Sequence, residues 1–223
     1  MFNKFYTLSL VFLLMVPLGT MFHECGHYLS AKFYGHQPVM HYASVSLQDV
    51  NKIKLLTDSL IHSVNMSSED KKDLYSEVLK LRKESFFITL SGPLFNMGMG
   101  SICFLILLLF GSNIHFHRYK WWFIFGSFLW SRQIINFCYG ILLFLKNGNW
   151  GQSGDETNLS NYLQYPAFTF DLMTAALASI ILLVVFINYM NKEERIAFVL
   201  AGTIAGSLSA LLWFKVIGPL LLP

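Results

Sequence analysis

The chain has 223 residues, of which 54% are hydrophobic and 13% charged, and its formal net charge is +3. This composition is far more apolar than that of a soluble domain of the same length, and it indicates a protein that crosses the lipid bilayer several times. The positive charges are spread thinly rather than gathered in a basic patch, which excludes nucleic acid as a partner. The three cysteines are odd in number and fall within apolar segments, so we expect no disulfide framework.

Five apolar segments are long enough to cross about 30 Å of hydrocarbon. They are residues 5–33, 85–110, 121–145, 167–190 and 196–222. We therefore predict an all-α polytopic membrane protein with about five transmembrane helices. The connection between the first two spans is the longest, and we expect a small β-like or amphipathic segment within it.

The first predicted span ends in an H-E-x-x-H motif at residues 23–27. On a helix, His23 and His27 project from one face with Cβ atoms about 5–6 Å apart, so both imidazoles can bind one metal ion. Glu24 can then approach the metal-bound water as general base, as in zinc peptidases. Two packed helix histidines beside a buried acid are the alternative, but ionisable groups at membrane depth are costly and usually functional. We expect Pro17 to kink this helix and to free backbone carbonyls near the motif.

The connection from residue 34 to residue 84 contains three kinds of pattern. Residues 38–47 alternate between apolar and polar side chains, which favours a strand or short hairpin. Residues 51–64 fit either a strand or a helix. From Ser67 a capping sequence precedes an apolar stripe, and we expect an amphipathic helix lying at the membrane surface beside the second span.

Three polar clusters that are distant in sequence share one membrane face if the spans alternate in direction. The H-E-x-x-H motif ends the first span, Asn96 lies in the first half of the second, and Asp155 follows the third within a Gly- and Asn-rich connection that indicates turns. Lys and Arg residues outside the spans number nine on this face and five on the other. This bias predicts that the shared face, and with it the candidate site, is cytoplasmic.

A catalytic zinc site usually has three protein ligands and a fourth position for water, so one ligand remains to be found. Asp155 is our preferred third ligand. Asp171 is the main alternative, although it also fits a capping acid near a helix start, and Glu156 is the third candidate. The remaining histidines are poorer candidates, because they lie on the opposite face or in the long connection: His36, His41, His62, His115 and His117.

Two further polar residues lie within predicted spans. Arg132, near the middle of the third span, requires a partner, and we expect a structural ion pair with Asp171 or a contact with a helix-end carbonyl in preference to a catalytic role. Asn96 is predicted to donate to the backbone of a substrate near the zinc, with helix–helix packing as the alternative. We treat Cys25, on a different helix face from the histidines, as a packing residue.

The chain resembles the site-2 protease family of intramembrane zinc metalloproteases. The resemblance covers roughly residues 5–165 and rests on the H-E-x-x-H motif, on Gly92-Pro93-Leu94-Phe95-Asn96, and on Gly154-Asp155-Glu156. It implies Zn²⁺ bound by His23, His27 and Asp155, with Glu24 activating water. It also implies a metalloprotease core in residues 1–165, made of three core helices and the connection 35–84. Residues 166–223 would add two transmembrane helices. The sequence departs from the family in its Asp-Glu pair, where an Asp-Gly pair after a proline-containing run is usual.

The expected function is hydrolysis of peptide bonds in transmembrane-helix protein substrates, which must unwind locally to expose the scissile bond. A membrane di-iron desaturase is excluded, because that class needs about eight clustered histidines and this chain has 7 in all. The alternative function is a catalytically inactive zinc-binding membrane scaffold that binds transmembrane helices. The intact Glu24 favours the enzyme.

Overall fold

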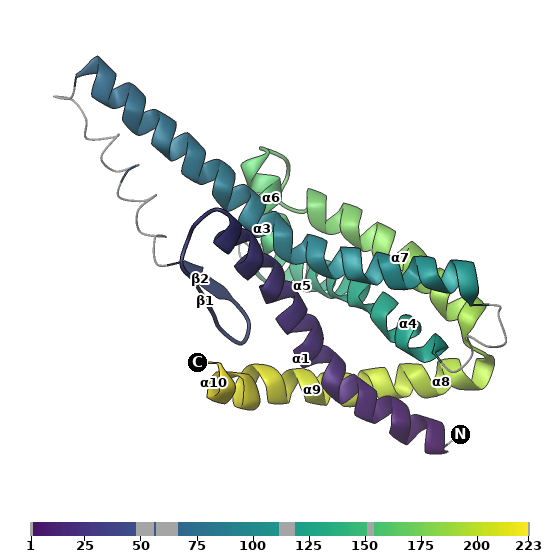
Figure 1. Ribbon diagram of the computed structural model, residues 1–223. Helices are drawn as coiled ribbons and strands as arrows, with labels where there is room; N and C mark the ends of the chain where they lie inside the picture. Colours follow the sequence, from purple (N-terminus) through teal and green to yellow (C-terminus); the bar gives the residue numbers. More distant parts are fainter. Residues whose placement is uncertain (1, 48–55, 57–66, 112–118, 151–153, 223) are drawn as a thin grey trace.

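The fold is a bundle of long helices with one small hairpin at the end that carries the candidate site (Figure 1). The computed structural model describes residues 2–47, 56, 67–111, 119–150 and 154–222. Within these residues, five helical stretches are long and apolar enough to cross a membrane: Lys4–Phe33, Ser68–Phe110, Lys120–Asn147, Thr169–Tyr189 and Lys192–Leu221. The predicted all-α polytopic fold is confirmed. The span bounds are close to those expected except in the second, whose helix begins at Ser68 instead of residue 85.

The first, second and fourth spans are single α-helices, α1 (Phe2–Phe33), α3 (Ser68–Phe110) and α7 (Thr169–Tyr189). The third span consists of α4 (Lys120–Ser127), a 3₁₀ turn η2 (Phe128–Trp130) and α5 (Ser131–Asn147). The fifth contains two π-helical turns, η3 (Gly202–Gly206) and η4 (Trp213–Ile217). These turns separate α8 (Lys192–Ala201), α9 (Ser207–Leu212) and α10 (Gly218–Leu221).

Helix α3 corrects one expectation from the sequence. We predicted a separate amphipathic helix lying beside the second span, but the segment from Ser68 to Glu84 is the first part of one 43-residue helix and extends beyond the bundle (Figure 1). The reason is local, because residues 81–86 contain no glycine or proline that would end the helix. The predicted start is confirmed, since the side chain of Ser67 accepts a hydrogen bond from the amide of Asp70.

Helix α1 continues through Pro17, which cannot donate to the carbonyl of Leu13 one turn earlier. That carbonyl accepts a hydrogen bond from the hydroxyl of Ser209 in α9 instead, at 2.7 Å. An unsatisfied carbonyl in hydrocarbon is costly, so Ser209 stabilises α1 at its proline and joins the first span to the fifth.

The expected hairpin is present in the first connection. Strands β1 (Pro38–Met40) and β2 (Val45–Leu47) pair antiparallel, with Val39 opposite Ser46. Two hydrogen bonds, both of 3.1 Å, join the turn of the hairpin to the end of the fifth span. The amide of Tyr42 donates to the carbonyl of Leu222, and the indole of Trp213 donates to the carbonyl of Tyr42. The segment 51–64, apart from residue 56, lies outside the described residues.

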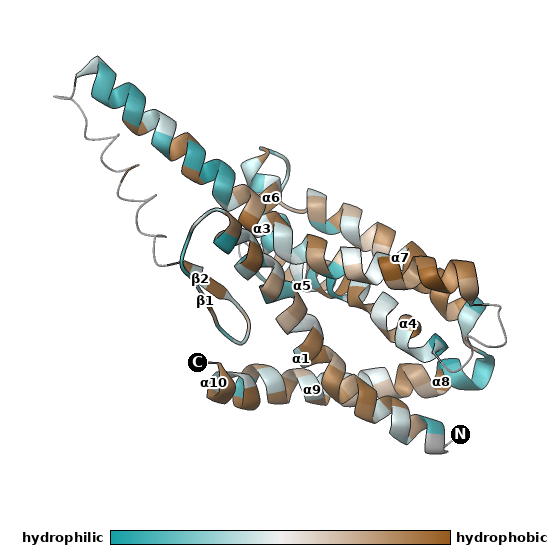
Figure 2. Ribbon diagram, in the orientation of Figure 1, coloured by the Kyte–Doolittle hydropathy of each residue, from teal (hydrophilic) through white to brown (hydrophobic). Residues whose placement is uncertain are grey.

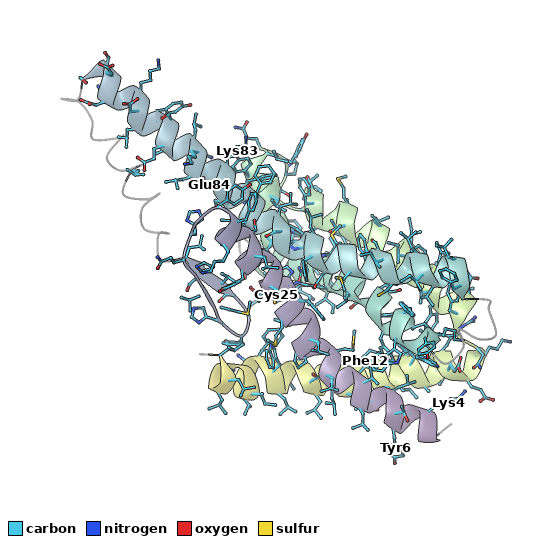
Figure 3. All side chains as sticks on the ribbon, viewed as in Figure 1. Lys4, Tyr6, Phe12, Cys25, Lys83 and Glu84 are labelled. Carbon is cyan, nitrogen blue, oxygen red and sulfur yellow. The ribbon has the colours of Figure 1, made fainter. Side chains whose placement is uncertain are left out.

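The apolar core lies at the end of the bundle opposite the hairpin. Phe12 of α1 is central to it, with ring centroids 4.8 Å from Phe198 and 5.5 Å from Phe125, whereas Tyr6 points outward (Figure 3). Large apolar side chains are exposed along all five spans. Figure 2 shows hydrophobic residues recurring along the same helices. A soluble protein would bury such side chains, whereas a bilayer accommodates them. The buried members of the core are Leu8, Leu107, Ile124, Phe125, Val185, Met190, Ala197, Phe198 and Ala201.

Candidate metal centre

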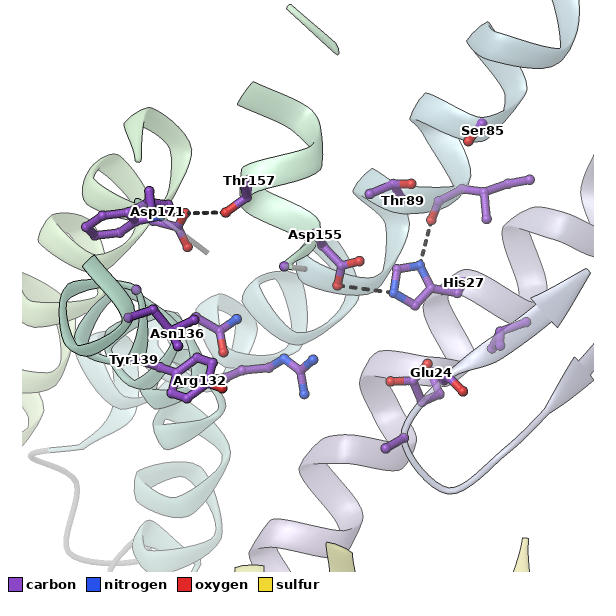
Figure 4. A pocket seen from close by; sticks show the side chains of 18 of the residues that line it. Glu24, His27, Ser85, Thr89, Arg132, Asn136, Tyr139, Asp155, Thr157 and Asp171 are labelled. Atoms are coloured by element: carbon purple, nitrogen blue, oxygen red, sulfur yellow. Dashed lines mark hydrogen bonds and ion pairs between the residues drawn. The ribbon is translucent and has the colours of Figure 1, made fainter. Parts of the chain in front are cut away.

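Three potential ligand atoms converge between α1 and the start of α6 (Asp155–Tyr162). His23, His27 and Asp155 each place one ligand atom so that all three lie within 4.8 Å of one another. His23 Nε2 lies 2.7 Å from Asp155 Oδ2 and 3.1 Å from His27 Nε2. His27 Nε2 lies 3.4 Å from Asp155 Oδ2, and Figure 4 shows these two side chains facing each other. The chain thus brings together the three residues that the sequence analysis named as ligands.

The donor set and its spacing are compatible with zinc. Two imidazole nitrogens and one carboxylate oxygen are common zinc ligands, and zinc bonds of about 2.0–2.2 Å keep tetrahedral ligand atoms roughly 3.3–3.6 Å apart. The separation between His27 and Asp155 falls in this range. The two histidine nitrogens, 3.1 Å apart, must move apart by about 0.2–0.5 Å, and His23 and Asp155, 2.7 Å apart, by about 0.6–0.9 Å. Both histidines are buried, and His23 is fully so.

The orientation of His27 is fixed from α3. Its Nδ1 donates to the carbonyl of Ile88 at 2.7 Å, which leaves Nε2 to face His23 and Asp155. The approach of the two helices depends on two glycines. A Cβ at Gly92 would overlap the His27 imidazole, and a Cβ at Gly26 would overlap the carbonyl oxygen of Ser91. Small residues at these positions therefore permit the contact between α1 and α3 on which the site is built.

Asp155 is the first residue of helix α6, and contacts with α5, α7 and α3 hold this helix in place. Glu156 Oε2 accepts from Asn136 of α5 at 3.2 Å, and the Thr157 hydroxyl donates to Asp171 of α7 at 3.1 Å. At the other end of α6, the ring of Tyr162 lies 4.5 Å from that of Phe86 in α3. The Gly- and Asn-rich sequence predicted turns here, and α6 was not predicted. The signal was the pair of acids in its first turn, which the helix dipole favours.

The two adjacent acids of α6 have opposite electrostatic surroundings. Burial alone would raise the pKa of Asp155, but hydrogen bonds from His23 and His27 outweigh it and hold that pKa well below its usual range. Asp155 is therefore a carboxylate, the form that binds metals. Burial raises the pKa of Glu156 to about 7, and the nearby charges of Asp155 and Asp171 add to the rise. Glu156 lies outside the ligand group.

A cavity of about 510 Å³ adjoins the ligand atoms. Glu24, His27 and Asp155 border it on one side (Figure 4). The hairpin contributes Ala43, Ser44, Val45 and Leu47, and α5 contributes Arg132, Asn136, Tyr139, Gly140 and Leu143. Within the described part of the chain, the Glu24 carboxylate has no hydrogen bond or ion pair, although the residue is only 3% exposed. This carboxylate is free to accept a proton beside the three ligands.

The other candidate residues occupy different positions. Asp171 borders the cavity but accepts hydrogen bonds from the indole of Trp150 and the hydroxyl of Thr157, both at 3.1 Å. The expected ion pair between Asp171 and Arg132 is therefore wrong, because neutral donors already satisfy the acid. Asn96 is buried, and its amide donates to the carbonyl of Gly19 at 3.1 Å. This contact favours helix packing, and Asn96 lies outside the lining of the cavity beside the ligands.

The histidines set aside in the sequence analysis remain outside the group. His36 pairs with Glu84 at 3.3 Å, and His41 contacts Ser46 at 2.9 Å. His62, His115 and His117 lie outside the described residues. All three cysteines are free thiols, and Cys25 is not part of the ligand group. Comparisons with protein-family models, with curated proteins and with solved structures return no match to this chain.

Proposed function

We propose that the chain is a zinc-dependent intramembrane endopeptidase that hydrolyses peptide bonds of transmembrane-helix proteins. One observation carries the proposal. The ligand atoms of His23, His27 and Asp155 converge where the first candidate span approaches the start of α6, and the unpartnered carboxylate of Glu24 borders the adjoining cavity. Ionisable groups in a membrane-spanning helix are costly, so His23, Glu24 and His27 gathered on α1 beside Asp155 support chemistry rather than packing.

In this proposal His23, His27 and Asp155 hold the zinc ion. When bound, zinc polarises the scissile carbonyl and lowers the pKa of a water molecule. Glu24 would take a proton from the attacking water and pass it to the leaving amine, which is the usual role of a general base next to the first histidine ligand. The Ile88 carbonyl keeps His27 in the tautomer that presents Nε2.

The hairpin supplies a surface for an unwound substrate. Strand β2 borders the cavity, and in the described part of the chain its second edge pairs with no strand. An extended peptide can pair with such an edge through backbone hydrogen bonds, independently of its sequence. The scissile peptide bond would then lie between the hairpin and α5, beside Glu24. The bias of Lys and Arg residues supports a cytoplasmic position for this end of the bundle.

Metal content and cleavage test the proposal together. We expect the purified protein to contain about one zinc per chain, and Glu24→Gln to keep the metal while losing cleavage of single-span peptides, read by mass spectrometry. Glu69→Gln, on the part of α3 outside the bundle, is the matched control and should behave as the parent. Zinc without cleavage in the parent would favour the inactive scaffold. A parent without zinc would refute both functions.

A further inference from the structure

Arg132 stands out among the residues around the metal centre because its charge has no partner. It is the second residue of α5, directly after the 3₁₀ turn η2, and it is the one Lys or Arg among the described residues that line the cavity. Its Nε is buried without a hydrogen bond, and no carboxylate of the described chain lies within ion-pair distance of its guanidinium. The side chain points into the cavity toward Glu24 (Figure 4).

The acids of the same cavity already have other roles. Asp155 contacts both histidines, and Asp171 accepts from Trp150 and Thr157. Arg132 also borders a second cavity of about 420 Å³ between α1, α5 and the fifth span, and no Asp or Glu lines that one. Glu24 is the third acid of the first cavity, and it is the general base of the proposed reaction. No acid among the described residues lies close enough to form an ion pair with Arg132.

The depth of Arg132 restricts what can neutralise it. It lies 12 residues after Lys120 and 15 before Asn147, the ends of the third span. At 1.5 Å per residue this places it roughly 18–22 Å from either end, beyond the reach of lipid headgroups. An unpaired charge at this depth is costly, and a guanidinium pairs best with a carboxylate through two parallel hydrogen bonds.

We propose that Arg132 is a specificity-determining residue that binds a carboxylate of the substrate. The inference rests on the proposed peptidase function and names its substrate class, which is an apolar membrane peptide that carries one carboxylate at mid-membrane depth. Two sources supply this chemistry. One is an aspartate or glutamate side chain within the substrate span, and the other is the free C-terminus of a span that has already been cut.

Peptide binding tests the proposal without turnover. The full chain carrying Glu24→Gln is titrated, by fluorescence anisotropy in detergent micelles, with four apolar 20-residue peptides. The four peptides combine a central Asp or Asn with a C-terminal carboxylate or amide, so one of them is neutral at both positions. We expect at least one carboxylate peptide to bind roughly 10- to 100-fold more tightly than the neutral peptide, and Arg132→Gln to abolish this preference. The central pair and the terminal pair separate the two sources.

Two control variants make the test specific. Lys146→Gln removes a positive charge at the end of the same helix, outside the cavity lining, and should leave the preference intact. Arg132→Lys keeps the positive charge but lacks the planar guanidinium, and it should retain part of the preference for the carboxylate peptide. The proposal is overturned if the Glu24→Gln chain binds all four peptides equally, or if the preference persists when Arg132→Gln is added to it. The peptidase function is tested separately, because this binding assay requires no cleavage. A parent protein that contains no zinc or cleaves no peptide would count against that function.

Discussion

Replacement of Gly92 by alanine tests the geometry of the metal centre most directly. The added methyl group would overlap the His27 imidazole. The ring or the whole of α1 must then move by roughly 1 Å before carbon atoms reach their packing distance of about 3.5–4.0 Å. Metal sites tolerate about 0.2 Å in ligand position, so the displacement removes His27 from the ligand set. We expect zinc affinity to fall by at least about 10- to 100-fold, the range seen when ligand positioning is disturbed.

The assay is the zinc content of purified Gly92→Ala and parent after equilibration with a competing chelator. Gly98→Ala is the matched control, because it lies on the same helix and no atom lies within 4 Å of an added Cβ. Both substitutions raise helix propensity by about 1 kcal/mol, so a difference between them reports on His27. Equal zinc retention in Gly92→Ala and the parent would refute the placement of His27 beside α3.

Two further predictions concern the third ligand and the proline of α1. Asp155→Asn should lower zinc retention more than Asp171→Asn, because Asp171 is held by neutral donors away from the ligand group. The reverse ranking, read from metal content, would move the ligand to α7. Ser209→Ala should lower the free energy of unfolding by about 1 kcal/mol, since it leaves the Leu13 carbonyl without a partner. Ser207→Ala, at an exposed position, should unfold at the parent's temperature, and an equal loss in both would contradict the assignment.

The features that were predictable from sequence depend on neighbours in the chain. The five spans follow from the length of their apolar runs, and the start of α3 follows from the cap formed by Ser67. The pairing of His23 with His27 on one face follows from helix periodicity. The approach of Asp155 needed one more step, the alternation of span directions, which brings its connection to the same end of the bundle.

The features that were missed depend on contacts between distant residues. Helix α6 has only eight residues and follows a Gly- and Asn-rich run, so its local sequence indicated turns. Contacts with Asn136 and Asp171 hold it in place, and neither is visible from residues 155–162 alone. The lack of a partner for Arg132 is likewise a property of the assembled bundle. Gly26 lies within the H-E-x-x-H motif, but the motif does not predict its packing against Ser91.

The bond between Ser209 and Leu13 has a consequence for biosynthesis. All three ligands precede residue 156, yet the proline of α1 is satisfied from the fifth span, and α6 is held by Asp171 in the fourth. The hairpin beside the cavity is also fastened by Trp213 and Leu222. When Asp155 has just left the ribosome, the nascent chain therefore contains all three candidate ligands but lacks these contacts, which align them. We therefore expect the three side chains to reach their final positions only after the fifth span has entered the membrane.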